Sequence, residues 1–230
     1  MKAMLLAAGK GERMRPLTLS TPKPLLQVRG RALIVHHIER LAAAGFRELV
    51  INVSWLGEQI EAHCGDGAAW GVTIDYSHEA QPLETAGGII RARTLLGTEP
   101  FLVMNADIFT DYPLDGLAAK AACLEPGQAH LVLVDNPPHH PGGDFTLRDG
   151  RVTRPDGATL TFAGIGLYHA QFFAGLDDGA RALKPLLLHA MDGAGLLGEH
   201  YRGSWTDVGT PQRLAELNEA AGTPSNTGQT

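Results

Sequence analysis

Two glycines near the start of the chain, Gly9 and Gly11, follow a short apolar run, and Arg13 and Arg15 come soon after them. Glycine lets backbone N–H groups approach an anion closely, and arginine supplies positive charge. Residues of these types at this spacing are suited to hold phosphate groups. On this stretch alone, an ordinary glycine-rich turn after a strand is almost as good an interpretation.

Two other phosphate-binding loops do not fit this stretch. Met14 stands where a dinucleotide-binding GxGxxG loop needs its third glycine, and the GxxxxGK[ST] spacing of a Walker A loop is absent. The apolar run at residues 3–8 is also too short for a secretory signal peptide. With no export signal, the cysteines Cys64 and Cys123 are expected to be reduced core residues of a cytoplasmic protein.

A lysine with restricted backbone follows the glycine loop. Lys23 stands between Pro22 and Pro24. Each proline fixes its own φ and favours an extended conformation in the residue before it. Lys23 is therefore expected to project from a stiff segment, which suits a cation that must meet a phosphate at a fixed place.

Two aspartates from distant parts of the chain invite a joint interpretation. Asp107 follows the buried run at residues 101–104, and Asp207 comes shortly before the last predicted helix. Alone, each is most often a turn or cap residue. Ligands of open parallel sheets bind beyond the carboxyl ends of the strands. Because one or two carboxylates together with phosphate oxygens suit Mg²⁺, the pair predicts a magnesium site.

The small residues at 83–88 form a third candidate segment. They stand at the start of a predicted helix, where unpaired backbone N–H groups suit a phosphate or the edge of a base. Glu84 and Thr85 are equally normal at an ordinary helix entry, and the two interpretations remain about even.

Composition excludes several classes of protein. The 230 residues carry a formal net charge of −6, which argues against a general nucleic-acid surface, and no apolar run is long enough to span a bilayer. His36 and His37 are poor co-ligands for zinc, because adjacent helical residues point about 100° apart. No Cys or carboxylate near them has the expected zinc-ligand spacing, so zinc is expected neither there nor at the similar pair His139 and His140.

Alternating strand and helix patterns predict an α/β fold with a parallel sheet covered on both faces and right-handed crossovers. Asp149 and Gly150 form a hairpin signal. The tail at residues 222–230 is expected to be disordered. The predicted strands are residues 2–7, 48–55, 72–77, 100–105, 130–134, 145–147, 151–153 and 160–168. The predicted helices are residues 32–44, 57–64, 86–96, 114–124 and 210–221.

Four motifs in this order resemble the sugar-1-phosphate nucleotidylyltransferases. They are the loop LAAGKGERMRPLT at residues 6–18 with PKPLL at 22–26, ETAGG at 84–88, NAD at 105–107 and WTDVGTP at 205–211. Within that family, the segments LETAGGI (83–89), VDNPPHHPGGDF (134–145) and TFAGIG (161–166) are most similar to the N-acetylmuramate-1-phosphate uridylyltransferases. Asn105 and Ala106 replace the Gly-Asp or Ser-Asp pair common in relatives, and Ala106 is small enough to be tolerated.

The resemblance implies a Rossmann-like three-layer α/β/α fold with a mixed, mostly parallel sheet. One domain would span residues 1–221, with a nucleotide-binding half at 1–110 and a sugar-phosphate-binding half at 111–221. The chain ends after this fold, so the extra functions that relatives place on a C-terminal β-helix are not expected. A monomer or weak homo-oligomer is expected, with neither nucleic acid nor a membrane as partner.

The resemblance also implies the substrates and the cofactor. UTP would react with a sugar 1-phosphate, N-acetylmuramate 1-phosphate, and Mg²⁺ would be the cofactor. The expected catalytic residues are Lys23, Arg15, Asp107 and Asp207, the last two also binding the metal. The expected nucleotide-binding residues are Ala7, Ala8, Gly9, Gly11, Glu12, Arg13, Met14, Lys23, Glu79, Glu84, Thr85, Ala86 and Gly87. The expected sugar-phosphate-binding residues are Asn105, Gly143, Asp144 and Gly164.

Two alternatives remain open on the same fold. One is a related transferase with another base or acceptor, such as guanylyl transfer to mannose- or heptose-1-phosphate or cytidylyl transfer to a polyol phosphate. The other is a non-catalytic nucleotide-sugar sensor, which the presence of Lys23, Asp107 and Asp207 disfavours.

Overall fold

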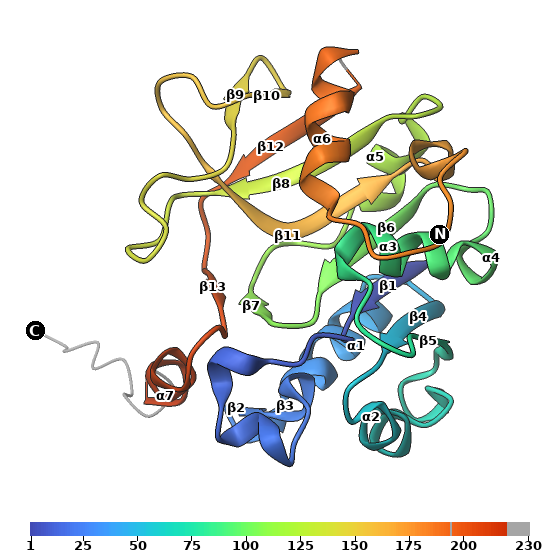
Figure 1. The fold of residues 1–230 in the computed structure, drawn as a ribbon, viewed down its shortest axis with the longest axis vertical. Helices are drawn as coiled ribbons and strands as arrows, with labels where there is room; N and C mark the ends of the chain where they lie inside the picture. Colours follow the sequence, from blue (N-terminus) through green and yellow to red (C-terminus); the bar gives the residue numbers. More distant parts are fainter. Residues whose placement is uncertain (194, 220–230) are drawn as a thin grey trace, which may run out of the picture.

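A nine-stranded sheet forms the centre of the molecule in the computed structural model, which describes residues 1–193 and 195–219 (Figure 1). The strand order is β5-β4-β1-β6-β11-β8-β12-β10-β9. Strands β11 and β10 run against the others, so the sheet is mixed with most strands pointing one way. The strands are β1 (Ala3–Leu6), β4 (Glu48–Val53), β5 (Thr73–His78), β6 (Phe101–Asn105), β8 (Ala129–Val134), β9 (Thr146–Arg148), β10 (Arg151–Thr153), β11 (Thr161–Tyr168) and β12 (Leu196–Tyr201).

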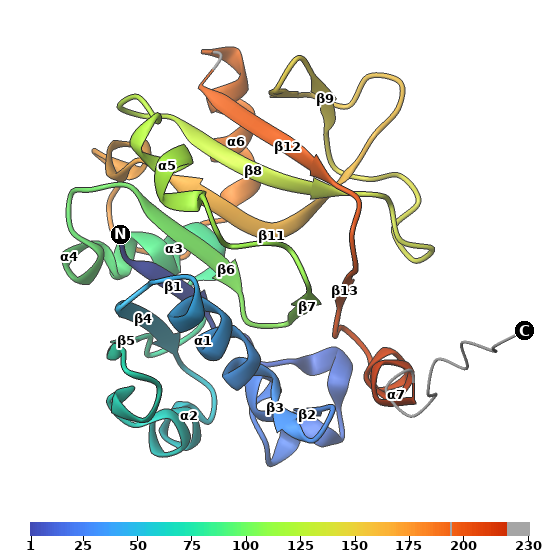
Figure 2. The ribbon, with the colours of Figure 1, turned by 180° about the vertical axis from the view of Figure 1, so that it is seen from behind.

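Helices cover both faces of this sheet and make the fold three-layered (Figures 1 and 2). One face packs against α1 (Leu33–Ala43), α2 (Gly57–Cys64) and α5 (Leu117–Ala122). The other packs against α3 (Glu84–Arg91), α4 (Arg93–Leu96) and α6 (Leu183–Asp192). Successive strand residues point to opposite faces, so the central strands must be apolar on both. In β1, Leu5 packs on the α1 side while Met4 packs on the α3 side.

A third, smaller cluster joins segments that are far apart in the chain. Its buried residues are Met14, Leu26, Val28, Leu33 and Val208. They come from the glycine loop, from the segment after Lys23 and from the segment after Asp207. The helix α7 (Pro211–Glu219) packs Leu214 and Leu217 against it, beside the hairpin of β2 (Gln27–Val28) and β3 (Arg31–Ala32). This cluster therefore holds three of the sequence motifs together.

Several boundaries differ from those predicted. The helix expected at 86–96 begins earlier, at Glu84, and is interrupted at Ala92, which separates α3 from α4. The helix α5 is shorter than the predicted 114–124. The structure adds α6, β12 and the two-stranded sheet of β7 (Ile108–Thr110) and β13 (Trp205–Asp207). Cys64 is buried but Cys123 is exposed, so the second thiol does not belong to the core.

Two expectations fall outside the described residues: the end of the last helix at 221 and the tail at 222–230. The nine-stranded sheet runs through both predicted halves of the chain, and their division of labour stays a prediction. Among the helices that the structure describes, none is both long and apolar enough to span a bilayer.

His37 is a buried histidine on α1. Burial, with Arg40 and His36 adding to it, lowers the pKa of His37 from 6.5 to about 4. The folded state therefore binds fewer protons than the unfolded state between these values. Keeping His37 neutral therefore contributes to the free energy of unfolding in full above pH 6.5. This contribution, about 3 kcal/mol in all, is lost as the pH falls towards 4.

We expect His37→Met to remove that loss, so that the free energy of unfolding depends less on pH between 6.5 and 4. Urea unfolding at pH 8, 6.5, 5 and 4.5 measures it. The exposed His63→Gln on α2 is the control and should keep the wild-type pH dependence. If the free energy of unfolding of His37→Met changes with pH as much as that of the wild type, the pH dependence does not come from His37.

Candidate functional site

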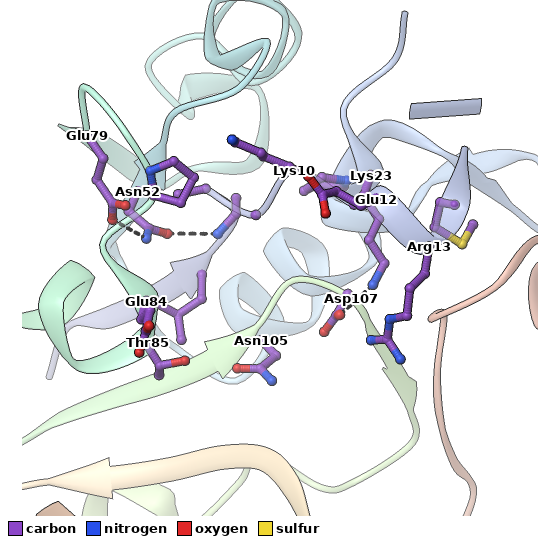
Figure 3. Close-up of a pocket in the computed structure, with 18 of the residues that line it drawn as sticks. Lys10, Glu12, Arg13, Lys23, Asn52, Glu79, Glu84, Thr85, Asn105 and Asp107 are labelled. Carbon is purple, nitrogen blue, oxygen red and sulfur yellow. Dashed lines mark hydrogen bonds and ion pairs between the residues drawn. The ribbon is translucent and has the colours of Figure 1, made fainter. Parts of the chain in front are cut away.

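A cavity of about 720 Å³ opens beside the carboxyl ends of β1 and β6 (Figure 3). It brings together most of the expected nucleotide-binding residues. The expected residues that line it are Ala7, Ala8, Gly9, Gly11, Glu12, Arg13, Met14, Lys23, Glu79, Glu84, Thr85, Asn105 and Asp107. The expected residues that are not part of its lining are Arg15, Ala86, Gly87, Gly143, Asp144, Gly164 and Asp207.

The glycine loop needs glycine at Gly11 for two reasons. Its φ is +62°, in the left-handed region, and a Cβ there would lie 2.9 Å from Thr18 Cγ2 and 3.3 Å from Lys23 Cβ. The Thr18 hydroxyl donates a hydrogen bond to the Gly11 carbonyl at 2.8 Å. Any side chain at this position would therefore push against the residues that shape the cavity.

The two arginines of this loop lie in different surroundings. A 3₁₀ turn at Glu12–Met14 places Arg13 in the cavity lining and buries Met14 completely in the third cluster. Arg15 follows in extended backbone, with an exposed side chain 3.7 Å from a Glu12 carboxylate oxygen. The cavity geometry thus favours Arg13 over Arg15 as the cation that meets a bound phosphate.

Lys23 and Asp107 form an ion pair inside the cavity. Lys23 Nζ lies 2.5 Å from Asp107 Oδ2, and Figure 3 shows the two side chains pointing toward one another. The Lys23 side chain is 10% exposed and that of Asp107 is 34% exposed. The lysine is therefore held almost out of water while the carboxylate keeps one side open to a ligand.

A buried polar bridge forms the opposite wall of the cavity. Asn52 Oδ1 accepts a hydrogen bond from the Ala7 N–H at 2.7 Å, and Asn52 Nδ2 donates to Glu79 Oε1 at 2.7 Å. The other Glu79 oxygen accepts from the Leu83 N–H at 2.9 Å. A Cβ at Gly88 would lie 2.7 Å from Glu79 Oε1, so glycine is needed there too.

Asn52 was not among the expected residues, although a signal was present. It is an amide near the end of the otherwise apolar run at residues 49–53. A polar residue buried in a central strand needs hydrogen-bond partners, which marks it for closer inspection. The cavity lining also includes Leu6, Lys10, Pro24 and Gly209, which lie within the quoted motifs, and Gln81 and Pro82, which lie between Glu79 and Glu84.

Two backbone N–H groups near the start of α3 have partners outside the helix. The Leu83 N–H is bonded to Glu79, and the Gly87 N–H donates to the Arg181 carbonyl at 3.1 Å. A Cβ on Gly87 would overlap the carbonyl oxygen of Gly179, so Gly87 packs against the segment before α6. Glu84 has a φ of +60° and lines the cavity. Such strained non-glycine residues tend to lie at functional sites.

The backbones around Asp107 and Asp207 lie side by side. In the ladder between β7 and β13, Asp207 is paired with Ile108, and the Val208 N–H donates to the Asp107 carbonyl at 2.7 Å. At the other end of this strand pair, the Thr110 hydroxyl donates to the Ser204 carbonyl at 2.7 Å. The tertiary structure thus joins two motifs that are a hundred positions apart.

The two carboxylates are each held by a separate cation. Asp107 pairs with Lys23, whereas Asp207 Oδ1 accepts from Arg213 Nη1 and lies 2.9 Å from His139 Nε2. In the described part of the chain, no group of three or more His, Cys, Asp or Glu side chains is placed to hold a metal ion. Asp107 directly precedes β7 and Asp207 ends β13, and carboxylates suit Mg²⁺, which takes its remaining ligands from phosphates and water.

The expected sugar-phosphate residues fall into two groups. Asn105 lines the cavity and packs on Gly164, where a Cβ would lie 2.7 Å from Asn105 Nδ2. Gly143, with φ +57°, packs instead on Asn136. Asp144 accepts from the Phe162 N–H at 3.0 Å and lies 3.3 Å from His140 Nε2. The structure therefore brings only Asn105 and Gly164 next to the cavity.

A three-layer fold with a glycine loop and a buried lysine–aspartate pair at one cavity, and a second aspartate on a strand paired next to that site, is the arrangement of a nucleotide-dependent transferase. Residues 2–223 match the family model described as "Nucleotidyl transferase", and the chain belongs to this family.

Relatives and solved structures agree with the family. The chain is 52% identical over 228 residues to an N-acetylmuramate alpha-1-phosphate uridylyltransferase of Neisseria meningitidis serogroup B, covering 96% of this chain and 99% of the relative. It is 36% identical to a protein of the same name from Caulobacter vibrioides, covering 93% and 97%. A Bacillus anthracis structure described as a glucose-1-phosphate thymidylyltransferase has the same fold, with a TM-score of 0.86, 20% identity and coverage of 100% and 98%.

Proposed function

We propose that the protein transfers a uridylyl group from UTP to N-acetylmuramate α-1-phosphate, giving UDP-N-acetylmuramate and pyrophosphate. The observation that carries the proposal is the Lys23–Asp107 ion pair facing the glycine-loop cavity, with the strand of Asp207 paired beside it. The names of the two relatives that span nearly the whole chain support this base and this acceptor.

The reaction is an in-line displacement at the α-phosphorus of the nucleotide. An oxygen of the sugar phosphate forms the new P–O bond while the bond to the β-phosphate breaks, and pyrophosphate leaves with the electron pair. The attacking phosphate monoester has a second pKa near 6, so it is mostly dianionic at pH 7 and needs no general base. The main obstacle is the approach of one anion to another.

The chain's own residues lower this obstacle by positioning and by charge. Arg13 and the amides of the loop around Gly9 and Gly11 bind the β- and γ-phosphates. Lys23 faces the α-phosphate and balances charge as the new bond forms. Asp107 and Asp207 would hold a magnesium ion, which supplies neutralisation of the phosphate oxygens when bound.

The bridge from Asn52 to Glu79 supports the rest of the nucleotide site. It holds the Ala7 N–H and the Leu83 N–H, and so ties the backbone before the glycine loop to the backbone before α3. Glu84 and Thr85 border the base, and Asn105 with Gly164 lies where the sugar of the acceptor joins its phosphate. Gly143 and Asp144 are not given a part in binding the acceptor, because neither lines the cavity.

Pyrophosphate release by the purified protein tests the proposal. We expect turnover with UTP, N-acetylmuramate 1-phosphate and Mg²⁺. Controls are GTP with mannose 1-phosphate, UTP with N-acetylglucosamine 1-phosphate, and EDTA. Faster turnover with GTP and mannose 1-phosphate would contradict the proposed uridylyl transfer and indicate guanylyl transfer instead. Binding of nucleotide without release from any pair would favour a non-catalytic sensor.

A further inference from the structure

The carboxylate of Asp207 is held by a side chain to which no catalytic part has been assigned. Arg213 Nη1, on α7, donates to Asp207 Oδ1. The pair is largely out of water, with the Arg213 side chain 14% exposed and that of Asp207 19% exposed. An arginine–carboxylate bond in such surroundings fixes a carboxylate more firmly than an exposed ion pair does.

Arg213 is itself held in place by the first turn of α7. The Thr210 hydroxyl oxygen accepts from the Arg213 N–H at 3.3 Å and from its Nε at 3.4 Å. The helix is anchored further along by Asn218, which donates to the Gln27 carbonyl at 3.1 Å and accepts from the Arg29 N–H at 2.6 Å. The helix that carries the guanidinium is therefore held by hydrogen bonds near its beginning and near its end.

Gly209 makes room for this arrangement. A Cβ there would overlap Arg213 Nη2 and would lie 2.6 Å from Asp207 Oδ2. Gly209 also lines the nucleotide cavity. The glycine thus lets the guanidinium and the carboxylate lie against a peptide that forms part of the cavity wall.

His139 adds a link to the loop between β8 and β9. Its Nε2 lies 2.9 Å from Asp207 Oδ1 and 2.6 Å from Arg213 Nη1. Arg213 and His139 both approach the same oxygen, and Oδ2 accepts no hydrogen bond within the described part of the chain. One oxygen is anchored and the other is left for a further ligand.

We propose that Arg213 is a positioning residue that fixes Asp207 through Oδ1, so that Oδ2 is presented to the divalent cation. This inference rests on the proposed function, because it assumes that Asp207 is a metal ligand. Hydrogen bonds to a ligating carboxylate tune metal affinity, and losing such a partner commonly costs ten- to a hundredfold.

The test is Mn²⁺ binding without turnover, measured from the EPR signal of free Mn²⁺ with UTP present and, in parallel, with GTP. Arg213→Met is expected to bind Mn²⁺ ten- to a hundredfold more weakly than wild type. Arg213→Lys should lose less, since it keeps the charge but not the planar fork. Gln212→Met, the neighbouring residue on α7, is the matched control and should bind as wild type does.

Gly209→Ala provides a second variant in case Arg213→Met does not fold, as judged by its Tm. It keeps every charge but leaves too little room for the guanidinium beside the Asp207 carboxylate, so a similar loss of Mn²⁺ affinity is expected. Wild-type Mn²⁺ affinity in folded Arg213→Met, or in Gly209→Ala, overturns the proposal.

A double-mutant cycle with Asp207→Asn shows whether Arg213 acts through that carboxylate. We expect Arg213→Met to change Mn²⁺ affinity and kcat little further in the Asp207→Asn background, because the two residues act as a unit. Additive losses would overturn the proposal. Since the binding measurement contains no acceptor, it stays informative if the proposed acceptor or base is wrong, which only the turnover assay reports.

Discussion

Asp107→Asn is expected to lower kcat by about 10²–10³, equivalent to about 3–4 kcal/mol of transition-state stabilisation, by analogy with the loss of one oxyanion contact. The substitution keeps the shape of the side chain but removes its charge. Lys23 Nζ lies 2.5 Å from Asp107 Oδ2, and Asp107 directly precedes the strand that pairs with that of Asp207, so both Lys23 and the proposed metal site lose a partner. The measurement is pyrophosphate release at saturating UTP and acceptor.

The same variant also removes half of a partly buried ion pair. We expect its free energy of unfolding to fall by about 1–3 kcal/mol, discounted because Asp107 is a third exposed. Asp111→Asn, four residues further along and exposed, is the control for turnover. A folded Asp107→Asn enzyme within threefold of the wild-type kcat would remove Asp107 from the proposed metal site.

Lys23→Met is expected to have an effect of similar size on kcat, about 10²–10³. The nearly buried ammonium lies inside the cavity and faces the position proposed for the α-phosphate. Because that phosphate carries the developing charge, the loss should appear in kcat at saturating nucleotide more than in KM. Steady-state kinetics with varied UTP concentration measure kcat and KM separately.

Lys10→Met supplies the matched control, since Lys10 lines the same cavity and its loss changes the charge equally. If the cavity attracts nucleotide only through its overall charge, the two variants behave alike. We expect instead that Lys10→Met raises KM a few fold and leaves kcat near wild type. Unchanged kcat in Lys23→Met would rule out the role assigned to this lysine.

The local patterns in the sequence were sufficient to predict much of the sheet. Apolar, β-branched runs predicted β4, β6 and β11 to within a few residues, because a strand buried on both faces needs continuous apolar sequence. The α6 helix and β12 escaped prediction. Their residues are less regularly patterned, and their place depends on packing against β8, β10 and α3.

The sequence by itself determined the residue types at the site and the family to which they belong. Gly11, Lys23 and Asp107 could be named because glycine, proline-bounded lysine and an aspartate after a strand each have a local physical reason. Asn52 could not be named in this way. Its function depends on Glu79 and Ala7, and no local pattern specifies those contacts.

Only the tertiary structure decided which of the two arginines lines the cavity and what holds each carboxylate. Arg13 and Arg15 are chemically identical, and a single 3₁₀ turn directs one into the cavity and the other outward. Arg213 and His139 reach Asp207 because α7 and the loop after β8 pack beside β13. Arg213 is only six residues from Asp207, but the direction of its side chain depends on how α7 packs against the cluster around Met14 and Val208. His139 comes from a distant segment, and sequence spacing carries no record of that contact.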